Sequence, residues 1–182
     1  MTEVLFVCTG NQCRSPLAES LLLDTAAAHG VALTVGSAGL VSEGIPPPAE
    51  LIGVAREAGI DLSGSRSRLI NADLLQSSEL VLTMTRQQLI EISVMAPSDW
   101  NRFFTLAEVL ERGYRLGGRR SGQTIQDWAR YLSTDRQRSQ LLSLSLSDDI
   151  ADPMGGTRKD YAAALAKLSL FTSRLFELIS TA

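Results

Sequence analysis

The chain has 182 residues, of which 45% are hydrophobic and 20% charged, and this composition suits one globular domain with its own core. The formal net charge of −3 excludes a general attraction to nucleic acid or to an anionic membrane, although it does not exclude a local basic site. No apolar run approaches the roughly 18 residues of a membrane span, and two cysteines with one histidine are too few for a disulfide framework or a zinc site, so we expect no membrane partner, no metal and no cofactor.

The first elements predicted along the chain enclose a short loop. Residues 3–8 form a compact apolar run with no basic region before it, which indicates a buried parallel strand rather than a secretory signal, so we expect a cytoplasmic protein. Residues 16–29 place apolar side chains at helical spacing, with Ser15 suited to the N-cap and Gly30 to the C-terminal stop. Residues 31–35 then predict a second strand.

Strands and helices continue to alternate through the rest of the chain. The patterns predict strands over residues 79–83 and 102–105, and helices over residues 49–58, 86–95, 106–112 and 159–179. This alternation is typical of a parallel sheet with helices on both faces, in which ligands bind beyond the carboxyl ends of the strands. Cys8 and the loop that follows it lie at that end of the first strand.

Residues 113–149 differ from the rest because they are polar and rich in arginine. Residues 125–132 and 137–144 predict short helices within this segment. One interpretation is a solvated insertion in a single domain that covers residues 1–182. The other is a lid, or a contact surface for an anionic partner.

The loop after the first strand reads Cys-Thr-Gly-Asn-Gln-Cys-Arg-Ser, with five residues between Cys8 and Arg14. This spacing lets successive backbone N–H groups surround one tetrahedral anion, and the following helix adds its positive N-terminal dipole. Arg14 presents a planar fork of donors to two phosphate oxygens. These surroundings favour the thiolate of Cys8, which is the reactive form of cysteine. We therefore predict a phosphate-binding loop with Cys8 as nucleophile and Arg14 as anion ligand, completed by Thr9, Gly10, Asn11, Gln12, Cys13 and Ser15.

Individual loop residues have their own expected tasks. Ser15 is placed to donate a hydrogen bond to the sulfur, Gly10 fits a positive φ, and Asn11 tolerates the left-handed region and ties the loop through its amide. The alternative is a buried structural cysteine beside an unrelated arginine. A Walker loop is excluded because no lysine precedes Lys159, and a dinucleotide fingerprint is excluded because Gly10 has no glycine partners.

The run Val-Cys-Thr-Gly-Asn-Gln-Cys-Arg-Ser-Pro-Leu-Ala-Glu, at residues 7–19, closely resembles the signature of the low-molecular-weight protein-tyrosine phosphatases. The resemblance continues at Ser-Ala-Gly (37–39), at Gly-Ile-Asp-Leu-Ser (59–63) and at Asp152-Pro153. It implies an α/β fold of the flavodoxin-like kind, a three-layer sandwich with a four-stranded parallel sheet. It also implies a metal-independent enzyme that hydrolyses phosphomonoesters through a phosphocysteine intermediate. In that reaction Cys8 attacks phosphorus, while Asp152 protonates the departing oxygen and then activates water.

Asp152 is also a candidate acid on chemical grounds, because Pro153 restricts its backbone and two glycines follow shortly after. The alternative is a turn that carries an acidic residue ahead of the last helix. Asp148 and Asp149 compete for the same role, whereas Asp160 fits the favourable charge of a first helical turn.

Several positions depart from the family pattern. No aromatic residue closely follows Asp152, and none occurs in residues 40–48, although such residues usually wall the phenyl ring of phosphotyrosine. Ser65 stands where the family often has a histidine that braces the loop asparagine, so Asn11 needs another partner. Gln12 fits neither the tyrosine-phosphate branch nor the arginine-phosphate branch.

Cys13 is the second cysteine of the loop. The family resemblance implies a reversible Cys8–Cys13 disulfide, which would protect Cys8 from irreversible oxidation. The alternative is a small buried residue that packs the loop.

The expected partner is a phosphorylated protein, with phosphotyrosine first, or a small phosphate ester; phosphoarginine stays open and nucleic acid is not expected. Arsenate reduction is a weaker alternative, because its cysteine relay extends beyond the nucleophile and this chain offers Cys13 alone. A non-enzymatic phosphate-binding module is a third alternative, which the presence of Cys8, Arg14 and Asp152 disfavours. The sequence does not indicate the oligomeric state.

Overall fold

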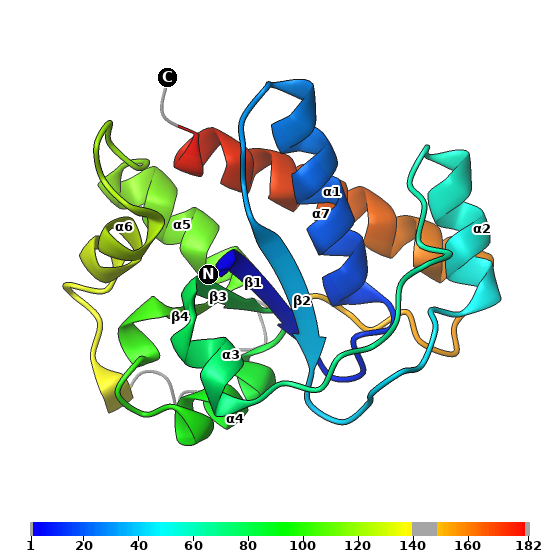
Figure 1. Cartoon of the computed structure of the whole chain (residues 1–182), viewed down its shortest axis with the longest axis horizontal. Coiled ribbons are helices and arrows are strands. Elements are labelled where there is room, and N and C mark those ends of the chain that lie inside the picture. The colour runs from blue at the N-terminus through cyan, green and yellow to red at the C-terminus, as the bar shows by residue number, and fades with distance from the viewer. Residues whose placement is uncertain (1, 140–148, 181–182) are drawn as a thin grey trace.

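The computed structural model describes residues 2–139 and 149–180, and it contains one parallel sheet (Figure 1). The strands are β1 (Thr2–Cys8), β2 (Val35–Gly39), β3 (Ser78–Thr83) and β4 (Phe103–Thr105), in the order β2-β1-β3-β4. All three neighbouring pairs are parallel, with Phe6 of β1 opposite both Ser37 and Leu82. The four-stranded parallel sheet predicted from the sequence is therefore confirmed.

Side chains of β1 alternate between two separate hydrophobic cores, as the pleat of a strand requires. Val4, Phe6 and Cys8 belong to the larger core, and Leu5 and Val7 to the smaller one. Both faces of β1 are thus buried, which explains why its sequence is a continuous apolar run rather than an alternating one.

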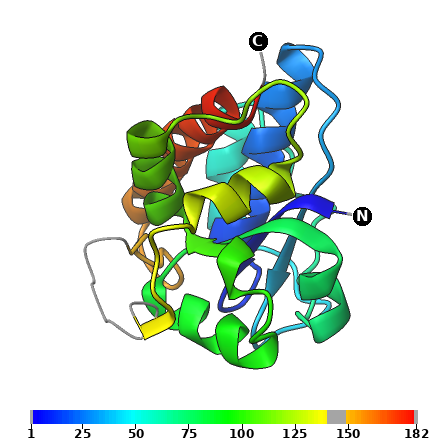
Figure 2. The same ribbon diagram turned by 90° about the vertical axis from the view of Figure 1, so that its left-hand side faces the viewer.

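Helices cover both faces of the sheet (Figures 1 and 2). The larger core joins the sheet to α1 (Arg14–Ala28), α2 (Ala49–Glu57), α5 (Leu106–Leu116), α6 (Ile125–Leu132) and α7 (Arg158–Ile179). The smaller core joins it to α3 (Ala72–Gln76) and α4 (Arg86–Met95), and the short 3₁₀ helix η1 (Trp100–Arg102) leads into β4. The predicted three-layer sandwich of the flavodoxin-like kind is confirmed. Within the described ranges, no helix has the length and apolar character that crossing a bilayer requires.

Two predicted boundaries next to the loop are wrong. The second strand was expected at residues 31–35, but β2 covers Val35–Gly39, because its pairing with β1 begins at Val35 opposite Val4. The first helix was expected to start after an N-cap at Ser15, but α1 begins at Arg14 and its N-cap is Cys13. The helix therefore begins two residues earlier than predicted, at Arg14 and not at Pro16, and Ser15 lies inside its first turn.

The described part of the arginine-rich segment, residues 113–139, combines an exposed polar surface with a set of buried side chains. The predicted helix at residues 125–132 is confirmed as α6, which faces the viewer in yellow-green in Figure 2. Trp128 of α6 is fully buried in the larger core, and its indole Nε1 donates to the backbone oxygen of Gly117 at 3.0 Å. Most of the other predicted helix, at residues 137–144, lies outside the described residues.

Arg136 holds the end of this segment against the sheet. Its guanidinium donates to Glu108 and to the backbone oxygen of Phe103 at 2.7 Å, and Glu108 also pairs with Arg86. Because all these groups are buried, burial lowers the pKa of Arg136 to about 10, although Glu108 opposes the shift. Of the arginines that suggested an exposed segment, Arg136 thus belongs to a buried ion-pair cluster, whereas Arg120, Arg130 and Arg138 are exposed.

Candidate active site

The loop from Cys8 to Ser15 lies where β1 ends and α1 begins, at the carboxyl edge of the sheet (Figure 1). Cys8 is 2% exposed and is the last residue of β1, so its sulfur is fixed by the sheet. Asn11 is the non-glycine residue with a positive φ, at 49°, among the described residues. The prediction that Asn11 adopts the left-handed region is therefore confirmed. The prediction of a positive φ at Gly10 is wrong.

The sulfur of Cys8 receives polar contacts from two sides. The backbone N–H of Asn11 donates to Sγ at 3.2 Å, and Oγ of Ser15 lies 3.0 Å from Sγ. Both groups come from the loop and the first turn of the helix, so the backbone is curled around the sulfur. Donors at these positions stabilise a negatively charged sulfur.

The side-chain amide of Asn11 is fixed at all of its donors and its acceptor. Nδ2 donates to Oγ of Ser15 at 2.9 Å and to Oγ of Ser37 at 2.8 Å, while Oδ1 accepts from the backbone N–H of Arg68 at 2.8 Å. These bonds join the loop to β2 and to the segment after residue 60. Asn11 therefore ties the loop to its surroundings, and its partners are Ser37 and Arg68; no hydrogen bond joins it to Ser65.

Two other side chains hold the outer turn of the loop. Gln88 of α4 donates through Nε2 to Oγ1 of Thr9 at 3.0 Å, while its Oε1 accepts from the backbone N–H groups of Met84 and Thr85. Gln12 donates to Oγ of Ser42 at 3.3 Å. The outer turn of the loop is therefore held by α4 and by the segment that follows β2.

Gly39 allows the end of β2 to approach the loop closely. A Cβ atom on Gly39 would lie 2.8 Å from the backbone nitrogen of Asn11 and 2.9 Å from the carbonyl carbon of Gly10. Backbone atoms at that distance cannot move away without distorting the loop. The glycine of the Ser-Ala-Gly motif is thus required by the shape of the loop between β1 and α1.

Arg14 points inward and joins the loop to the segment that carries Asp152. Its Nη1 donates to the backbone oxygen of Ile150 at 3.0 Å, and its Nη2 forms an ion pair with Asp152. Arg14 is 3% exposed, and its Nε has no hydrogen-bond partner among the described residues. A buried guanidinium N–H without a partner is a donor that an anion in the loop can use.

The segment before Asp152 is anchored by its backbone. Ile150 is buried, and its N–H donates to the oxygen of Met84 at 2.8 Å. A carboxylate oxygen of Asp149 accepts from the backbone N–H of Arg86 at 2.8 Å, so Asp149 has a structural contact at the start of α4. Asp152 itself is more open, with 44% of its side chain exposed.

Asp160 lies in the first turn of α7, as predicted, and it also forms a capping box with Thr157. Its Oδ2 accepts from both the backbone N–H and the hydroxyl of Thr157 at 2.7 Å, and these hydrogen bonds lower the pKa of Asp160. Asp148, the remaining competing carboxylate, lies outside the described residues. Of the described candidates, Asp152 is the one that faces Arg14.

Cys13 differs from Cys8 in its surroundings. Both cysteines are free thiols and both are buried. Burial, together with the negative charges of Asp152 and Cys8, raises the pKa of Cys13 to about 12, against the opposing effect of Arg14. Cys13 therefore keeps its proton at neutral pH and does not compete as a nucleophile.

A cavity of about 520 Å³ opens in front of Arg14 and Asp152. The described residues that line it include carboxylates and amides but no aromatic side chain: Thr9, Arg14, Leu40, Val41, Thr85, Gln87, Gln88, Glu91, Asp149, Ile150, Ala151 and Asp152. Within residues 2–139 and 149–180, no three side chains of the His, Cys, Asp or Glu type lie together in a way that would hold a metal ion.

The sequence analysis did not identify the groups from other elements that hold the loop in place. Ser37 and Gly39 belong to the Ser-Ala-Gly motif that carried the resemblance, so a signal existed without an assigned role. Gln88 and the backbone N–H of Arg68 gave no local signal, because their contacts span 79 and 57 positions of the chain.

A cysteine–arginine loop at the carboxyl end of a central parallel strand, faced by an aspartate, defines a class of α/β proteins built to handle phosphate through a thiol. Residues 3–118 match the family model described as low molecular weight phosphotyrosine protein phosphatase. The match covers more than half of the chain, and the chain belongs to this family of hydrolases.

Individual relatives cover different parts of the chain. The probable low molecular weight protein-tyrosine-phosphatase EpsP of Ralstonia solanacearum is 35% identical over 106 residues, which are 58% of this chain and 71% of that protein. An arsenate reductase of Bacillus licheniformis is 42% identical over 82 residues, which are 44% of this chain and 55% of the reductase. The solved structure of the YwlE arginine phosphatase from Geobacillus stearothermophilus is similar with a TM-score of 0.71 and 29% identity, over 97% of this chain and 92% of that one.

Proposed function

We propose that this chain is a metal-independent phosphatase that uses Cys8 as its nucleophile, Arg14 as its anion ligand and Asp152 as its acid and base. The observation that carries the proposal is the buried sulfur of Cys8, held by Asn11 N–H and Ser15, beside a guanidinium with an unpaired Nε. A tetrahedral dianion placed in this loop would meet N–H donors on several sides and the sulfur on one.

The reaction then runs in two steps. The Cys8 thiolate attacks phosphorus in line, the sulfur–phosphorus bond forms, and the bond to the leaving oxygen breaks as that oxygen takes a proton from Asp152. Arg14 and the loop N–H groups stabilise the equatorial oxygens. In the second step Asp152 removes a proton from water, which attacks phosphorus and releases phosphate and the Cys8 thiolate.

The ion pair between Arg14 and Asp152 prepares both residues for this sequence. In the free protein the guanidinium holds the carboxylate near the loop. A bound dianion competes with Asp152 for Arg14, so substrate binding loosens this ion pair.

The direct test is the hydrolysis of para-nitrophenyl phosphate with and without EDTA. We expect turnover that EDTA leaves unchanged and that Cys8→Ser abolishes. An acid quench of Asp152→Ala during turnover should contain phosphate bound to Cys8, detected as a mass increase of the peptide that contains Cys8. Stoichiometric phosphate binding without turnover would instead support a binding module.

Phosphoarginine is a second candidate substrate, beside protein phosphotyrosine and small phosphate esters, because the mouth of the cavity favours a cationic leaving group. Glu91, Asp149 and Asp152 line it together with Gln87 and Gln88, and no described lining residue is aromatic. A phenyl ring would lack a stacking partner there, whereas a guanidinium would meet carboxylate and amide acceptors. The kcat/KM values for peptides that differ only in phosphotyrosine or phosphoarginine distinguish the two classes.

Arsenate reduction is not favoured, despite the relative of that name. Among the described residues the loop offers Cys13 as a partner thiol. Because its pKa is about 12, this thiol stays protonated at neutral pH and reacts poorly in disulfide exchange. Because the proposed chemistry needs a reduced Cys8, we also propose a reducing compartment such as the cytoplasm.

A further inference from the structure

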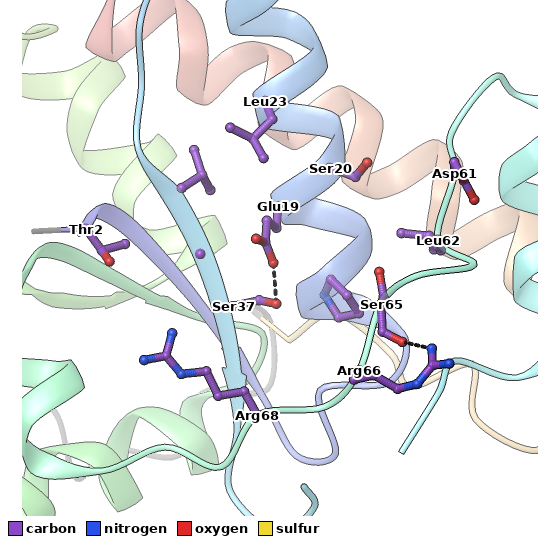
Figure 3. A pocket seen from close by; sticks show the side chains of 13 residues that line it. Thr2, Glu19, Ser20, Leu23, Ser37, Asp61, Leu62, Ser65, Arg66 and Arg68 are labelled. Carbon is purple, nitrogen blue, oxygen red and sulfur yellow. Dashed lines mark hydrogen bonds between the residues drawn. The ribbon is translucent and has the colours of Figure 1, made fainter. Parts of the chain in front are cut away.

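The segment that carries Asp152 is held by contacts of its own, separate from those of the loop after β1. On the far side of that loop, Figure 3 shows the carboxylate of Glu19 turned toward Ser37, whose hydroxyl donates to Oε2 of Glu19 at 2.5 Å. This contact joins α1 to β2 and involves no residue of the segment at 149–152. The position of Asp152 therefore depends on other groups.

The segment rests on the start of α4. The backbone N–H of Arg86, the first residue of that helix, donates to Oδ1 of Asp149 at 2.8 Å. The next residue, Ile150, donates through its own N–H to the backbone oxygen of Met84 at 2.8 Å. A displacement of the helix start would therefore move Asp149 and Ile150, and with them Asp152 two residues further on.

The side chain of Arg86 points into the interior, where it shares a buried carboxylate with a second arginine. Its Nη1 donates to Oε2 of Glu108 at 3.1 Å. Arg136 approaches the same carboxylate with Nε 2.8 Å from Oε1 and Nη2 3.0 Å from Oε2. All three side chains are buried, and a buried ion pair that loses one partner leaves a charge that its surroundings must rearrange to accommodate. The orientation of Arg86 therefore depends on both Glu108 and Arg136.

Arg136 is itself fixed by the sheet. Its Nη1 donates to the backbone oxygen of Phe103 in β4 at 2.7 Å, and its guanidinium lies 4.4 Å from the centre of the Phe104 ring. The planar fork of an arginine thus meets a carboxylate, a strand carbonyl and an aromatic face at once, which the single ammonium of a lysine could not do. Arg136 can therefore hold Glu108 in one position against the start of α4.

We infer that Arg136 is a positioning residue for the proposed acid, Asp152. Through the carboxylate of Glu108 it fixes Arg86 at the start of α4, and Arg86 in turn holds the segment that leads to Asp152. Arg136 does not line the cavity in front of that acid, so it acts through these other groups. Its effect on turnover rests on the proposed function, whereas its effect on the backbone N–H of Ile150 does not.

The first readout is amide hydrogen exchange in Arg136→Met, which removes the fork and fills much of the same volume with an apolar side chain. The exchange rate of the Ile150 N–H is compared by NMR with that of the Asn11 N–H, which donates to the sulfur of Cys8. Taking the ratio of the two rates cancels any change in global stability. We expect this ratio to rise about tenfold, because the segment at residue 150 opens locally while the loop does not.

The second readout is kcat for phenyl phosphate, whose leaving group depends on a proton from the acid. In Arg136→Met we expect kcat per folded molecule to fall about tenfold with little change in KM, because the acid is displaced while the anion loop is kept. In the Asp149→Ala background the same substitution should lower kcat less than twofold. Two residues that act on one segment are not additive, whereas independent structural damage would be.

Matched variants separate positioning from stability. Arg115→Met removes an exposed arginine that pairs with Asp135, the neighbour of Arg136, and should change neither readout. Trp128→Ala removes a buried side chain from the same part of the chain without touching Glu108, and its kcat per folded molecule should stay unchanged. If Arg136→Met does not fold, Arg136→Lys keeps a cation beside Glu108 without the fork, and should shift both readouts in the same direction by a smaller factor.

The outcomes for the inference and for the proposed function differ. An unchanged exchange ratio in the folded Arg136 variant, or an equal rise in Arg115→Met, would overturn the inference. A raised ratio with an unchanged kcat would overturn it as well, since the displaced segment would then not matter for catalysis. A raised ratio in a protein whose wild type shows no turnover would retain the positioning of the segment and reject the proposed function.

Discussion

Arg14 connects the two parts of the candidate site, the loop after β1 and the segment that carries Asp152. It reaches from the first turn of α1 to the backbone of Ile150 and to the carboxylate of Asp152. The acid is thereby held close to the loop, although the two residues are separated by 138 positions of the chain. In the proposed reaction, Arg14 would therefore do more than bind the anion, because it would also position the proposed proton donor.

The role of Asp152 can be tested by the leaving group. In Asp152→Ala we expect kcat for phenyl phosphate to fall about 10²- to 10⁴-fold, because phenolate needs a proton to depart. The fall for para-nitrophenyl phosphate should be far smaller, because nitrophenolate leaves without one. Steady-state kinetics on both substrates provide the measurement.

Asp149→Ala serves as the comparison for this test, because Asp149 lines the same cavity but uses a carboxylate oxygen to accept from the N–H of Arg86. It should slow both substrates by a similar factor, through a displaced segment. An equal loss on both substrates in Asp152→Ala as well would remove Asp152 from the role of acid.

At the scale of elements, the loop keeps its shape because β2 ends in a glycine. In Gly39→Ala the new methyl group would meet the backbone of Asn11 and Gly10 at less than 3 Å, so the loop must shift. We expect a loss of about 1–3 kcal/mol in the free energy of unfolding, together with a loss of phosphate binding. Urea denaturation and phosphate titration measure the two effects.

Gly36→Ala on the same strand is the matched control for this substitution. Its methyl group would lie 3.5 Å from a side-chain carbon of Thr2, an ordinary contact, so stability and phosphate binding should change little. If Gly36→Ala and Gly39→Ala lowered phosphate binding equally, the close approach of Gly39 would not be the cause.

Elements with strong local signals could be predicted, whereas β2, whose bounds depend on its pairing with β1, was misplaced. The helix at residues 86–95 was predicted with the boundaries of α4, where Thr85 and Gln88 form a capping box. The strand β2 was placed four residues too early, because Val31 to Val35 is the more apolar run, while the Gly-Ser-Ala-Gly sequence forms a strand through its pairing with β1. The five-residue helix α3 was missed altogether, since it is shorter than a recognisable period.

The same distinction holds for the candidate site. Cys8, Asn11, Arg14 and Ser15 lie within eight consecutive residues, so their spacing alone predicted that they surround one anion. Ser37, Gln88 and Glu19 support that loop through side chains that the fold brings near it, and hydrogen bonds of this range leave no periodic trace in a sequence.

At the scale of the whole molecule, the arginine-rich segment contributes buried side chains to the interior, among them Trp128 and Arg136. Glu108 of α5 accepts from both Arg86 and Arg136, so one buried carboxylate joins α4, α5 and the residues after α6. Breaking such a cluster leaves a buried charge without a partner, which is far more costly than losing an exposed ion pair. Arginine content alone could not distinguish this arrangement from a solvated surface.

Trp128 gives the sharpest test of that conclusion. It is fully buried in the larger core and hydrogen-bonded to Gly117, so Trp128→Ala should lower the free energy of unfolding by about 3–5 kcal/mol in urea denaturation. Arg130→Ala, an exposed position on the same helix, should change it by less than about 0.5 kcal/mol. Because α6 does not line the cavity in front of Arg14, the folded fraction of Trp128→Ala should keep its kcat/KM for para-nitrophenyl phosphate. A loss below about 1 kcal/mol would mean that the segment is appended to the core rather than part of it.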